Sequence, residues 1–272
     1  LAYEGAAYVP TNRIGGRTGG WGWSSVWQEQ VWDTLPPGTY YNTQVAVEET
    51  GLEYADLVVT NNRFVTSPNA WTYGDWGNTT EAPFSRNRRV IGLDGNMHLV
   101  NANNTFGKPG TTNWVSFLAR FESGTPEEYG IDFAINNNGN DIGLLAVGRV
   151  PATTTWGAWV PGTSLQVSTT NDATSGTAFL VTRLISGATE DTLHLWVNPS
   201  LGAEPPAANA VELASIPHIE FDRRGLRASG SPAPFASLDE LRLGETWESV
   251  TPIIPEPALL LALAALALLR RR

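Results

Sequence analysis

Short segments in which apolar and polar residues alternate recur through this chain, and they constrain its fold more than any other feature. In residues 114–121, for example, Val115, Phe117, Ala119 and Phe121 occupy every second position. A period of two is that of a β-strand with one buried face. Comparable segments follow one another at a spacing of roughly ten residues, which is typical of antiparallel sandwiches and barrels. No amphipathic helical pattern interrupts them, so the sequence predicts an all-β fold.

The strands expected from this pattern cover most of the chain. They comprise residues 1–9, 44–49, 52–59, 88–93, 97–100, 114–121, 129–135, 142–150, 177–185, 191–197, 211–214, 218–221 and 235–243. Residues 136–141 are expected to form a hairpin loop, because Asn, Gly and Asp tolerate positive φ. Residues 246–250 are expected to add one helical turn. The arrangement indicates an antiparallel jelly-roll sandwich.

The composition excludes several functional classes. The 272 residues carry a formal net charge of −10, which argues against nucleic acid and anionic lipid surfaces as partners. The chain has no cysteine, so disulfide bonds and thiol chemistry are excluded, and its 42% hydrophobic residues must supply the core. It begins with Leu1 rather than Met, either because a secretory signal peptide has been removed or because the sequence is a fragment.

The last eighteen residues have three parts in order. They are the helix-breaking Pro255, Glu256 and Pro257, an apolar run at 258–269, and the basic residues Arg270, Arg271 and Arg272. The twelve apolar residues span about 18 Å as a helix, whereas the hydrocarbon core of a bilayer is about 30 Å thick. This short hydrophobic helix therefore suits a transient membrane stop better than a permanent anchor. The alternative, an amphipathic or core helix, would need a polar face that the run does not have.

The tail resembles the PEP-CTERM protein-sorting signal, which consists of Pro-Glu-Pro, a hydrophobic segment and an arginine cluster. The resemblance implies export across the inner membrane of a Gram-negative bacterium, with transient anchoring through residues 258–272. It also implies recognition and cleavage by an exosortase, and a final location at the cell surface or in an extracellular polysaccharide matrix. The basic end agrees, because cytoplasmic flanks of membrane segments are enriched in arginine, which places residues 1–254 outside.

A second resemblance concerns the passenger, expected at residues 1–251, with a linker at 252–257 before the sorting segment. Its motifs resemble those of exported concanavalin A-like (LamG-like) jelly-roll proteins. They are Tyr3-Glu4-Gly5, Gly19-Gly20-Trp21-Gly22-Trp23-Ser24 and the segments at 114–118, 180–183, 193–199 and 238–244. The resemblance implies the jelly-roll fold. These motifs are strand patterns rather than site signatures, so they leave the ligand open.

The glycine-rich residues 15–20 directly precede Trp21 and Trp23. Such a run can cradle a phosphate, but no Gly-Lys-Ser/Thr follows it and no helical pattern opens after it. We therefore expect glycine turns that let large indole side chains pack closely.

Glycosidase chemistry requires two carboxylates that flank the scissile bond. In glucanases of the jelly-roll class these alternate along one strand as Glu-x-Asp-x-x-Glu or Glu-x-Asp-x-Glu, and neither spacing occurs around Glu128 or Glu220. Asp239 and Glu240 are adjacent, so they are expected on opposite faces of a closing edge strand.

The sequence also contains no residue pattern typical of a metal site or of a catalytic nucleophile. The histidines at 98, 194 and 218 are not at ligand spacing, and no Gly-x-Ser-x-Gly elbow is present. The sequence thus predicts a protein without catalytic residues or cofactor. Calcium stays open, because irregular loops can supply oxygen ligands, and residues 75–78 and 136–141 are the candidates. A plain turn is the favoured interpretation of both.

Carbohydrate is the remaining ligand hypothesis. Trp71, Tyr73 and Trp76 lie between expected strands with polar residues interleaved. Sugar faces stack on exposed aromatic rings, so this loop is either a glycan platform or a plug over the core. With eleven tryptophans to bury, the plug is favoured. Three hypotheses result: a non-catalytic glycan-binding or adhesive surface protein, a secreted glycosidase or lyase, and a structural envelope protein without a ligand.

Overall fold

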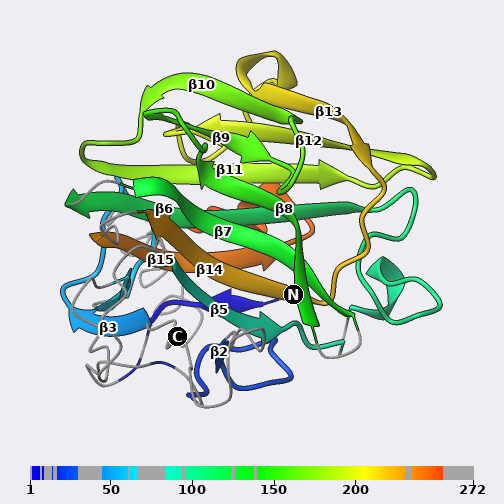
Figure 1. The fold of residues 1–272 in the computed structure, drawn as a ribbon, viewed down its shortest axis with the longest axis horizontal. Helices are drawn as coiled ribbons and strands as arrows, with labels where there is room; N and C mark the ends of the chain where they lie inside the picture. Colours follow the sequence, from blue (N-terminus) through cyan, green and yellow to red (C-terminus); the bar gives the residue numbers. More distant parts are fainter. Residues whose placement is uncertain are drawn as a thin grey trace, which may run out of the picture.

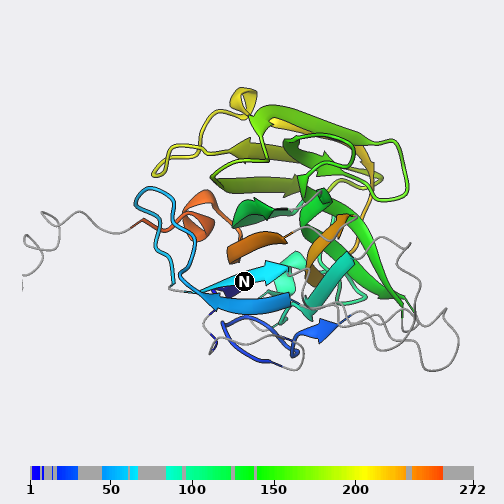
Figure 2. The same cartoon turned by 60° about the vertical axis from the view of Figure 1, so that its left-hand side comes forward.

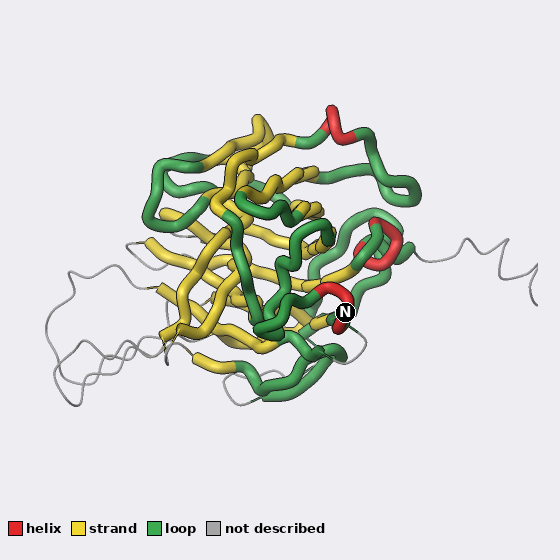
Figure 3. Tube along the Cα trace, turned by 90° about the vertical axis from the view of Figure 1, so that its right-hand side faces the viewer, coloured by secondary structure: helices red, strands yellow, loops and turns green. Residues whose placement is uncertain are grey.

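The protein is an antiparallel β-sandwich with very little helix (Figures 1 and 3). The structure, a computed structural model, describes residues 2–6, 8, 14, 17–29, 45–60, 62–66, 84–93, 96–123, 126–137, 140–230 and 235–253. Every strand pair in it is antiparallel, so the predicted all-β sandwich is confirmed.

Two sheets form the sandwich. The eight-stranded sheet has the order β13 (Val211–Pro217), β12 (Glu190–Val197), β11 (Thr177–Ile185), β6 (Thr112–Ser123), β15 (Phe235–Gly244), β4 (Asn62–Thr66) and β3 (Val45–Glu49), with β1 (Tyr3–Glu4) also paired to β15. The seven-stranded sheet has the order β10 (Gln166–Asp172), β9 (Thr155–Trp159), β8 (Asn140–Arg149), β7 (Pro126–Asn137), β14 (Arg223–Gly230), β5 (Phe84–Val90) and β2 (Gln28–Glu29). Figure 1 shows β8, β7, β14 and β5 running side by side.

The main core contains apolar side chains from both sheets. Val115 and Phe117 of β6 are buried as the alternation predicted, and Ile131 and Phe133 of β7 belong to the same cluster from the other sheet. Burying each such side chain contributes about 1.5–3 kcal/mol, and this is the main stabilising contribution in a chain that has no cysteine.

One arginine lies inside this core. Arg224 of β14 is fully buried, with its guanidinium carbon 3.4 Å from the ring centroid of Phe133 and 3.9 Å from that of Phe221. Within the described part of the chain, none of its three side-chain nitrogens has a hydrogen-bond partner. Burial lowers the pKa of Arg224 well below its usual value, with Asp132 acting in the opposite direction.

A second core covers the outer face of the eight-stranded sheet. The loop at residues 50–60 and the helical turn α1 (Trp247–Val250) lie beside each other over this face (Figure 2). The cluster consists of Leu52, Leu57, Trp114, Leu118, Phe179, Val181, Trp196, Trp247 and Val250. The helical turn predicted for residues 246–250 is confirmed, and Leu57 forms an isolated bridge with Ile253.

Three glycines form a row across the seven-stranded sheet. Gly130, Gly148 and Gly157 are cross-strand neighbours in β7, β8 and β9. Gly130 and Gly148 have φ values of +152° and +154°, and a Cβ on Gly148 would collide with the carbonyl oxygen of Tyr129. The glycines thus let the backbones of neighbouring strands approach closely.

Several predicted elements are wrong. Residues 52–59 form a loop rather than a strand, because their apolar side chains face the second core instead of alternating across a sheet. Residues 97–100 contain a 3₁₀ turn, Met97–Leu99, and residues 218–221 only reach an isolated bridge at Phe221. The hairpin at 136–141 is confirmed, but its strands extend to Asn137 and resume at Asn140, so the turn is shorter than expected.

A β-bulge in β15 overturns the prediction for Asp239 and Glu240. β15 lies between β6 and β4 rather than at an edge. Its register shifts between Asp239 and Arg242, and Glu240 has a φ of 54°. The extra residue resets the alternation, because Leu238 and Leu241 both enter the main core. Both carboxylates therefore lie on the outer side, where each is buried.

The two carboxylates hold the loop at residues 50–60. Asp239 accepts a hydrogen bond from the backbone N–H of Leu52 at 3.0 Å. Glu240 accepts hydrogen bonds from the backbone N–H and the hydroxyl of Thr60. Burial raises the pKa of Asp239 to about 8, and the neighbouring charge of Glu240 adds to the rise.

Candidate functional site

Most residues that the sequence singled out lie outside the described ranges. These are Trp71, Tyr73 and Trp76, residues 75–78, and the sorting residues Pro255, Glu256, Pro257, Arg270, Arg271 and Arg272. Within the described ranges, no helix has the length and apolar character needed to cross a bilayer. No three metal-ligating side chains gather among the residues that the structure describes.

Two carboxylates of the seven-stranded sheet, both in β7, are engaged by arginines. Asp132 of β7 forms an ion pair with Arg88 of β5, with 2.6 Å between Oδ2 and Nη2 and both side chains fully buried. Glu128, near the start of β7, pairs with Arg227 of β14. The adjacent guanidinium groups hold these carboxylates in ion pairs, an arrangement that suits structure rather than general acid–base chemistry.

An open cavity beside the N-terminal strand brings exposed and half-buried indoles together with polar groups. It has a volume of about 430 Å³. We call it the indole pocket, and it is lined by Thr18, Gly19, Gly20, Trp21, Trp23, Ser24, Ser25, Val26 and Arg89.

The loop at residues 18–26 is fixed between β1 and β5. Trp21 and Tyr3 exchange backbone hydrogen bonds of 3.1 and 3.0 Å, and the indole N–H of Trp23 donates to the Tyr3 carbonyl at 3.0 Å. Gly20 has a φ of +61° and packs against the backbone of Tyr3, where a Cβ would collide with its carbonyl oxygen. On the other side, Ser24 donates its backbone N–H to Val90. The predicted close packing of indoles beside glycine turns holds for the half-buried Trp23, whereas Trp21 is exposed, and Gly15 and Gly16 lie outside the described residues.

Arg89 holds the two ends of this loop together. Its Nε donates to the carbonyl of Ser25 at 2.9 Å, and its Nη1 donates to the carbonyl of Gly19 at 2.8 Å. Nη1 also forms a buried ion pair with Glu4 of β1, whose carboxylate accepts the Tyr8 hydroxyl at 2.7 Å. The guanidinium carbon lies 5.3 Å from the ring centroid of Trp23, a cation–π contact.

The ion pair of Glu4 and Arg89, next to the pocket, is buried away from water. Burial raises the pKa of the Glu4 carboxyl above its ordinary value, and hydrogen bonds from Tyr8 and Arg89 act in the opposite direction. Trp27, which donates its indole N–H to Tyr8 at 3.0 Å, closes the network toward the main core. The pocket is thereby linked through Arg89, Glu4 and Tyr8 to Trp27 in the main core.

Trp21 differs from the other tryptophans that the structure describes. Its exposed fraction is 60%, whereas Trp23 is half-buried and the remaining described indoles are buried. An indole ordinarily buries 150–250 Å² and dominates core energetics, so leaving one on the surface forgoes a large stabilisation. The sequence identified the indole run but did not distinguish the exposed member, because its exposure depends on contacts with Tyr3, far away in the chain.

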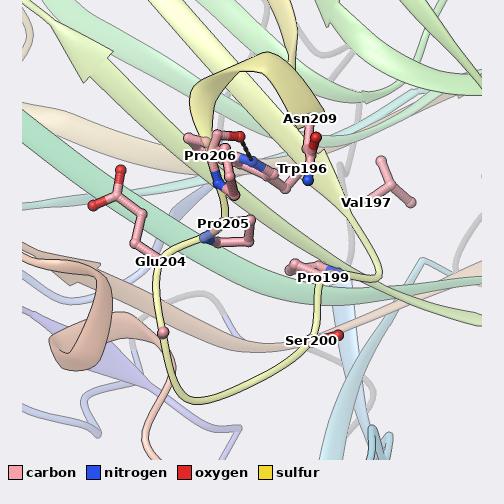
Figure 4. A pocket seen from close by; sticks show the side chains of 9 residues that line it. Trp196, Val197, Pro199, Ser200, Glu204, Pro205, Pro206 and Asn209 are labelled. Carbon is pink, nitrogen blue, oxygen red and sulfur yellow. Dashed lines mark hydrogen bonds between the residues drawn. The ribbon is translucent and has the colours of Figure 1, made fainter.

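A second cavity, of about 410 Å³, opens beside β12 and the loop that follows it (Figure 4). Its floor is Trp196, which is buried and whose indole N–H points to the carbonyl of Pro206 at 3.5 Å (Figure 4). Glu204 on its rim pairs with Arg183 at 2.6 Å. With its indole covered and its carboxylate occupied, this cavity offers a ligand less stacking surface than the indole pocket.

Comparisons with known proteins give structural similarities alone. No family model matches the chain, and no curated protein matches it. A solved endo-1,3-β-glucanase from Streptomyces sioyaensis is similar with a TM-score of 0.44 and 11% identity, over 89% of this chain and 95% of that one. The binding domain of botulinum neurotoxin DC in complex with SialylT has a TM-score of 0.40 and 11% identity over 85% of this chain. The chain spans 50% of that neurotoxin chain. The carbohydrate recognition domain of Emp46p, in its metal-free form, has a TM-score of 0.37 and 11% identity, over 72% and 87% of the two chains.

Proposed function

We propose that the sandwich is a non-catalytic glycan-binding module and that the indole pocket is its binding site. The observation that carries this proposal is the exposed side chain of Trp21 beside the half-buried Trp23 at the mouth of a cavity. The apolar face of a sugar ring stacks on such a surface, while neighbouring polar groups bind its hydroxyls. The cavity volume of about 430 Å³ falls within the range of roughly 300–1,000 Å³ that is common for small-ligand sites.

The polar lining supports binding rather than hydrolysis. Thr18 and Ser24 supply hydroxyl groups, and Arg89 supplies guanidinium N–H groups. The described residues that line the pocket include no Asp, Glu or His, whereas glycoside hydrolysis requires a pair of carboxylates. A ligand here would be held and oriented without a general acid.

A polysaccharide array tests this function. The wild-type protein is expected to bind at least one glycan, and Trp21→Ala is expected to weaken that binding by about tenfold or more, equivalent to about 1.4 kcal/mol. Trp21→Phe keeps an aromatic face and should retain most of the affinity. Met97→Ala, which truncates another exposed apolar side chain outside the pocket, is the matched control and should bind normally.

Three results would contradict the proposal. Release of reducing ends from a bound glycan would instead support the glycosidase hypothesis. Wild-type binding that survives Trp21→Ala unchanged would place the site elsewhere, and an absence of binding to every glycan would support the purely structural hypothesis.

We further propose that this module is exported and sorted by an exosortase, with delivery to the cell surface or extracellular matrix. The order of Pro255, Glu256 and Pro257, the apolar residues 258–269 and three arginines supports this. Glu256→Ala, or deletion of residues 270–272, is expected to make the uncleaved precursor accumulate in the inner membrane. Immunoblotting of membrane and surface fractions measures this, and normal processing of both variants would contradict it.

A further inference from the structure

Arg89 lines the indole pocket with a guanidinium group that is only partly used. Its side chain is 3% exposed. Nε and Nη1 donate to Ser25, Gly19, Glu4 and the Tyr8 hydroxyl. Nη2 makes no hydrogen bond with any described residue. The pocket therefore contains a desolvated cation with one donor nitrogen left for a ligand.

The guanidinium is also held in one orientation. Its carbon lies 5.3 Å from the ring centroid of Trp23 and 5.8 Å from that of Trp27, so two adjacent indoles pack against it. Its bonded nitrogens fix rotation in the guanidinium plane. A ligand that binds Nη2 therefore does not need to immobilise a flexible arginine, which lowers the entropic cost of binding.

The charge of the lining is positive. Arg89 is its charged member, and the only carboxylate of the described residues that contacts Arg89 is Glu4, which pairs with Nη1 and is not part of the pocket lining. A carboxylate adds ion-pair attraction to its hydrogen bonds with a guanidinium, which a neutral hydroxyl does not. The lining thus favours an acidic ligand over a neutral one.

We propose that the indole pocket selects acidic sugars, namely uronic acid residues of a polysaccharide. This inference rests on the proposed glycan-binding function and specifies its ligand class. The sugar ring stacks on Trp21, and its carboxylate accepts hydrogen bonds from Nη2 of Arg89. The hydroxyls of Thr18 and Ser24 bind the remaining ring substituents.

The net negative charge of the protein does not oppose this selectivity at physiological ionic strength. The net charge of −10 is spread over the whole chain, and the screening length is about 8 Å at physiological ionic strength. Distant carboxylates are therefore largely screened, whereas a direct contact inside the pocket is not.

Matched ligands test the inference without altering the buried ion pair. The full chain is titrated calorimetrically with oligomers of galacturonate, glucuronate and mannuronate, and with the fully methyl-esterified form of each. The esters keep the rings and linkages but remove the charge. We expect at least one acid to bind about tenfold or more tightly than its ester, and Trp21→Ala to weaken both forms.

The outcomes separate this inference from the proposed function. Equal affinities for an acid and its ester, both lost in Trp21→Ala, would overturn the acid selectivity and leave glycan binding intact. Tighter binding of a sulfated oligosaccharide that contains no uronate than of any uronate oligomer would also overturn the assignment to a carboxylate. Failure of all acids and esters to bind, while a neutral glycan on the array binds through Trp21, would overturn the inference alone.

Discussion

Asp239 and Glu240 are neighbours in β15, yet both carboxylates reach the same loop on one side of the sheet. The bulge that follows Asp239 places Asp239 on the N–H of Leu52 and Glu240 on Thr60, toward opposite ends of the loop. Arg242 adds a third contact, to the carbonyl of Val58. The segment at residues 239–242 therefore fixes the loop at residues 50–60, which packs with Trp114 and Trp247 in the second core.

The raised pKa of Asp239, about 8 against an ordinary value of 3.8, makes stability depend on pH. The folded chain binds this proton more tightly than the unfolded chain does. Its contribution to the free energy of unfolding is therefore full below about pH 4 and is lost as the pH rises toward 8. Asp239→Asn is expected to flatten the stability profile over this window, measured by urea unfolding at stepwise pH.

The control for this measurement is Asp172→Asn. Asp172 is exposed, and hydrogen bonds from Thr174 lower its pKa, so its effect has the opposite sign and falls at more acidic pH. Wild type and Asp239→Asn with parallel profiles between pH 4 and 8 would show that Asp239 does not titrate in this window.

Arg224 is expected to lower the free energy of unfolding. Methionine fills a similar volume between Phe133 and Phe221 without a buried guanidinium that lacks hydrogen bonds. Arg224→Met should raise the free energy of unfolding by about 1–4 kcal/mol in chemical denaturation. Arg88→Met is the matched contrast, because it removes the cation of the buried Arg88–Asp132 ion pair and should cost about 3–5 kcal/mol. Similar losses in both variants would mean that Arg224 has a stabilising partner.

The glycine row tests close packing between strands. Gly148→Ala introduces a Cβ against the carbonyl of Tyr129 and a φ of +154°, whereas Gly162→Ala meets a φ of +79° with no atom within 4 Å of the new Cβ. Gly162→Ala should cost about 1–2 kcal/mol from backbone strain alone. Gly148→Ala should cost clearly more in the same denaturation assay, and equal costs would show that the strands can separate freely.

Glu4 offers a way to adjust the charge at the indole pocket. Glu4→Gln keeps an oxygen acceptor for Arg89 and Tyr8 but removes the negative charge behind the guanidinium. Affinity for a uronate oligomer is expected to rise by about fivefold, close to 1 kcal/mol, with no change for its methyl ester. Glu128→Gln, which alters a carboxylate paired with Arg227 instead, is the control and should leave both affinities unchanged.

Period-two alternation was enough to locate the long strands, and it failed where an outer face carries charge or has a second layer. β6 was predicted because its apolar residues alternate toward one core. β14 was not, because Arg223, Arg224 and Arg227 interrupt any apolar pattern, and Arg224 enters the core as a charged residue.

The site shows a similar division. Glycine turns that pack indoles could be predicted from residues 15–27, since glycine and tryptophan have local consequences. Which indole stays exposed, and which guanidinium lines the cavity, depends on Tyr3 and Arg89, which meet the loop only through the tertiary fold. The bulge at Glu240 likewise cannot be predicted from the alternation, because one inserted residue moves every later side chain of the strand to the opposite face.

The loop at residues 50–60 also determines how a pulling force would enter the molecule. Leu57 and Val58 pair through their backbones with Ile253 and Pro252, where the described chain leaves the sandwich. Tension applied beyond this point would first load that short pairing and α1, and only afterwards the long ladder between β15 and β6. The outer layer would then unfold first under force, and the sheets that position Trp21 would stay folded.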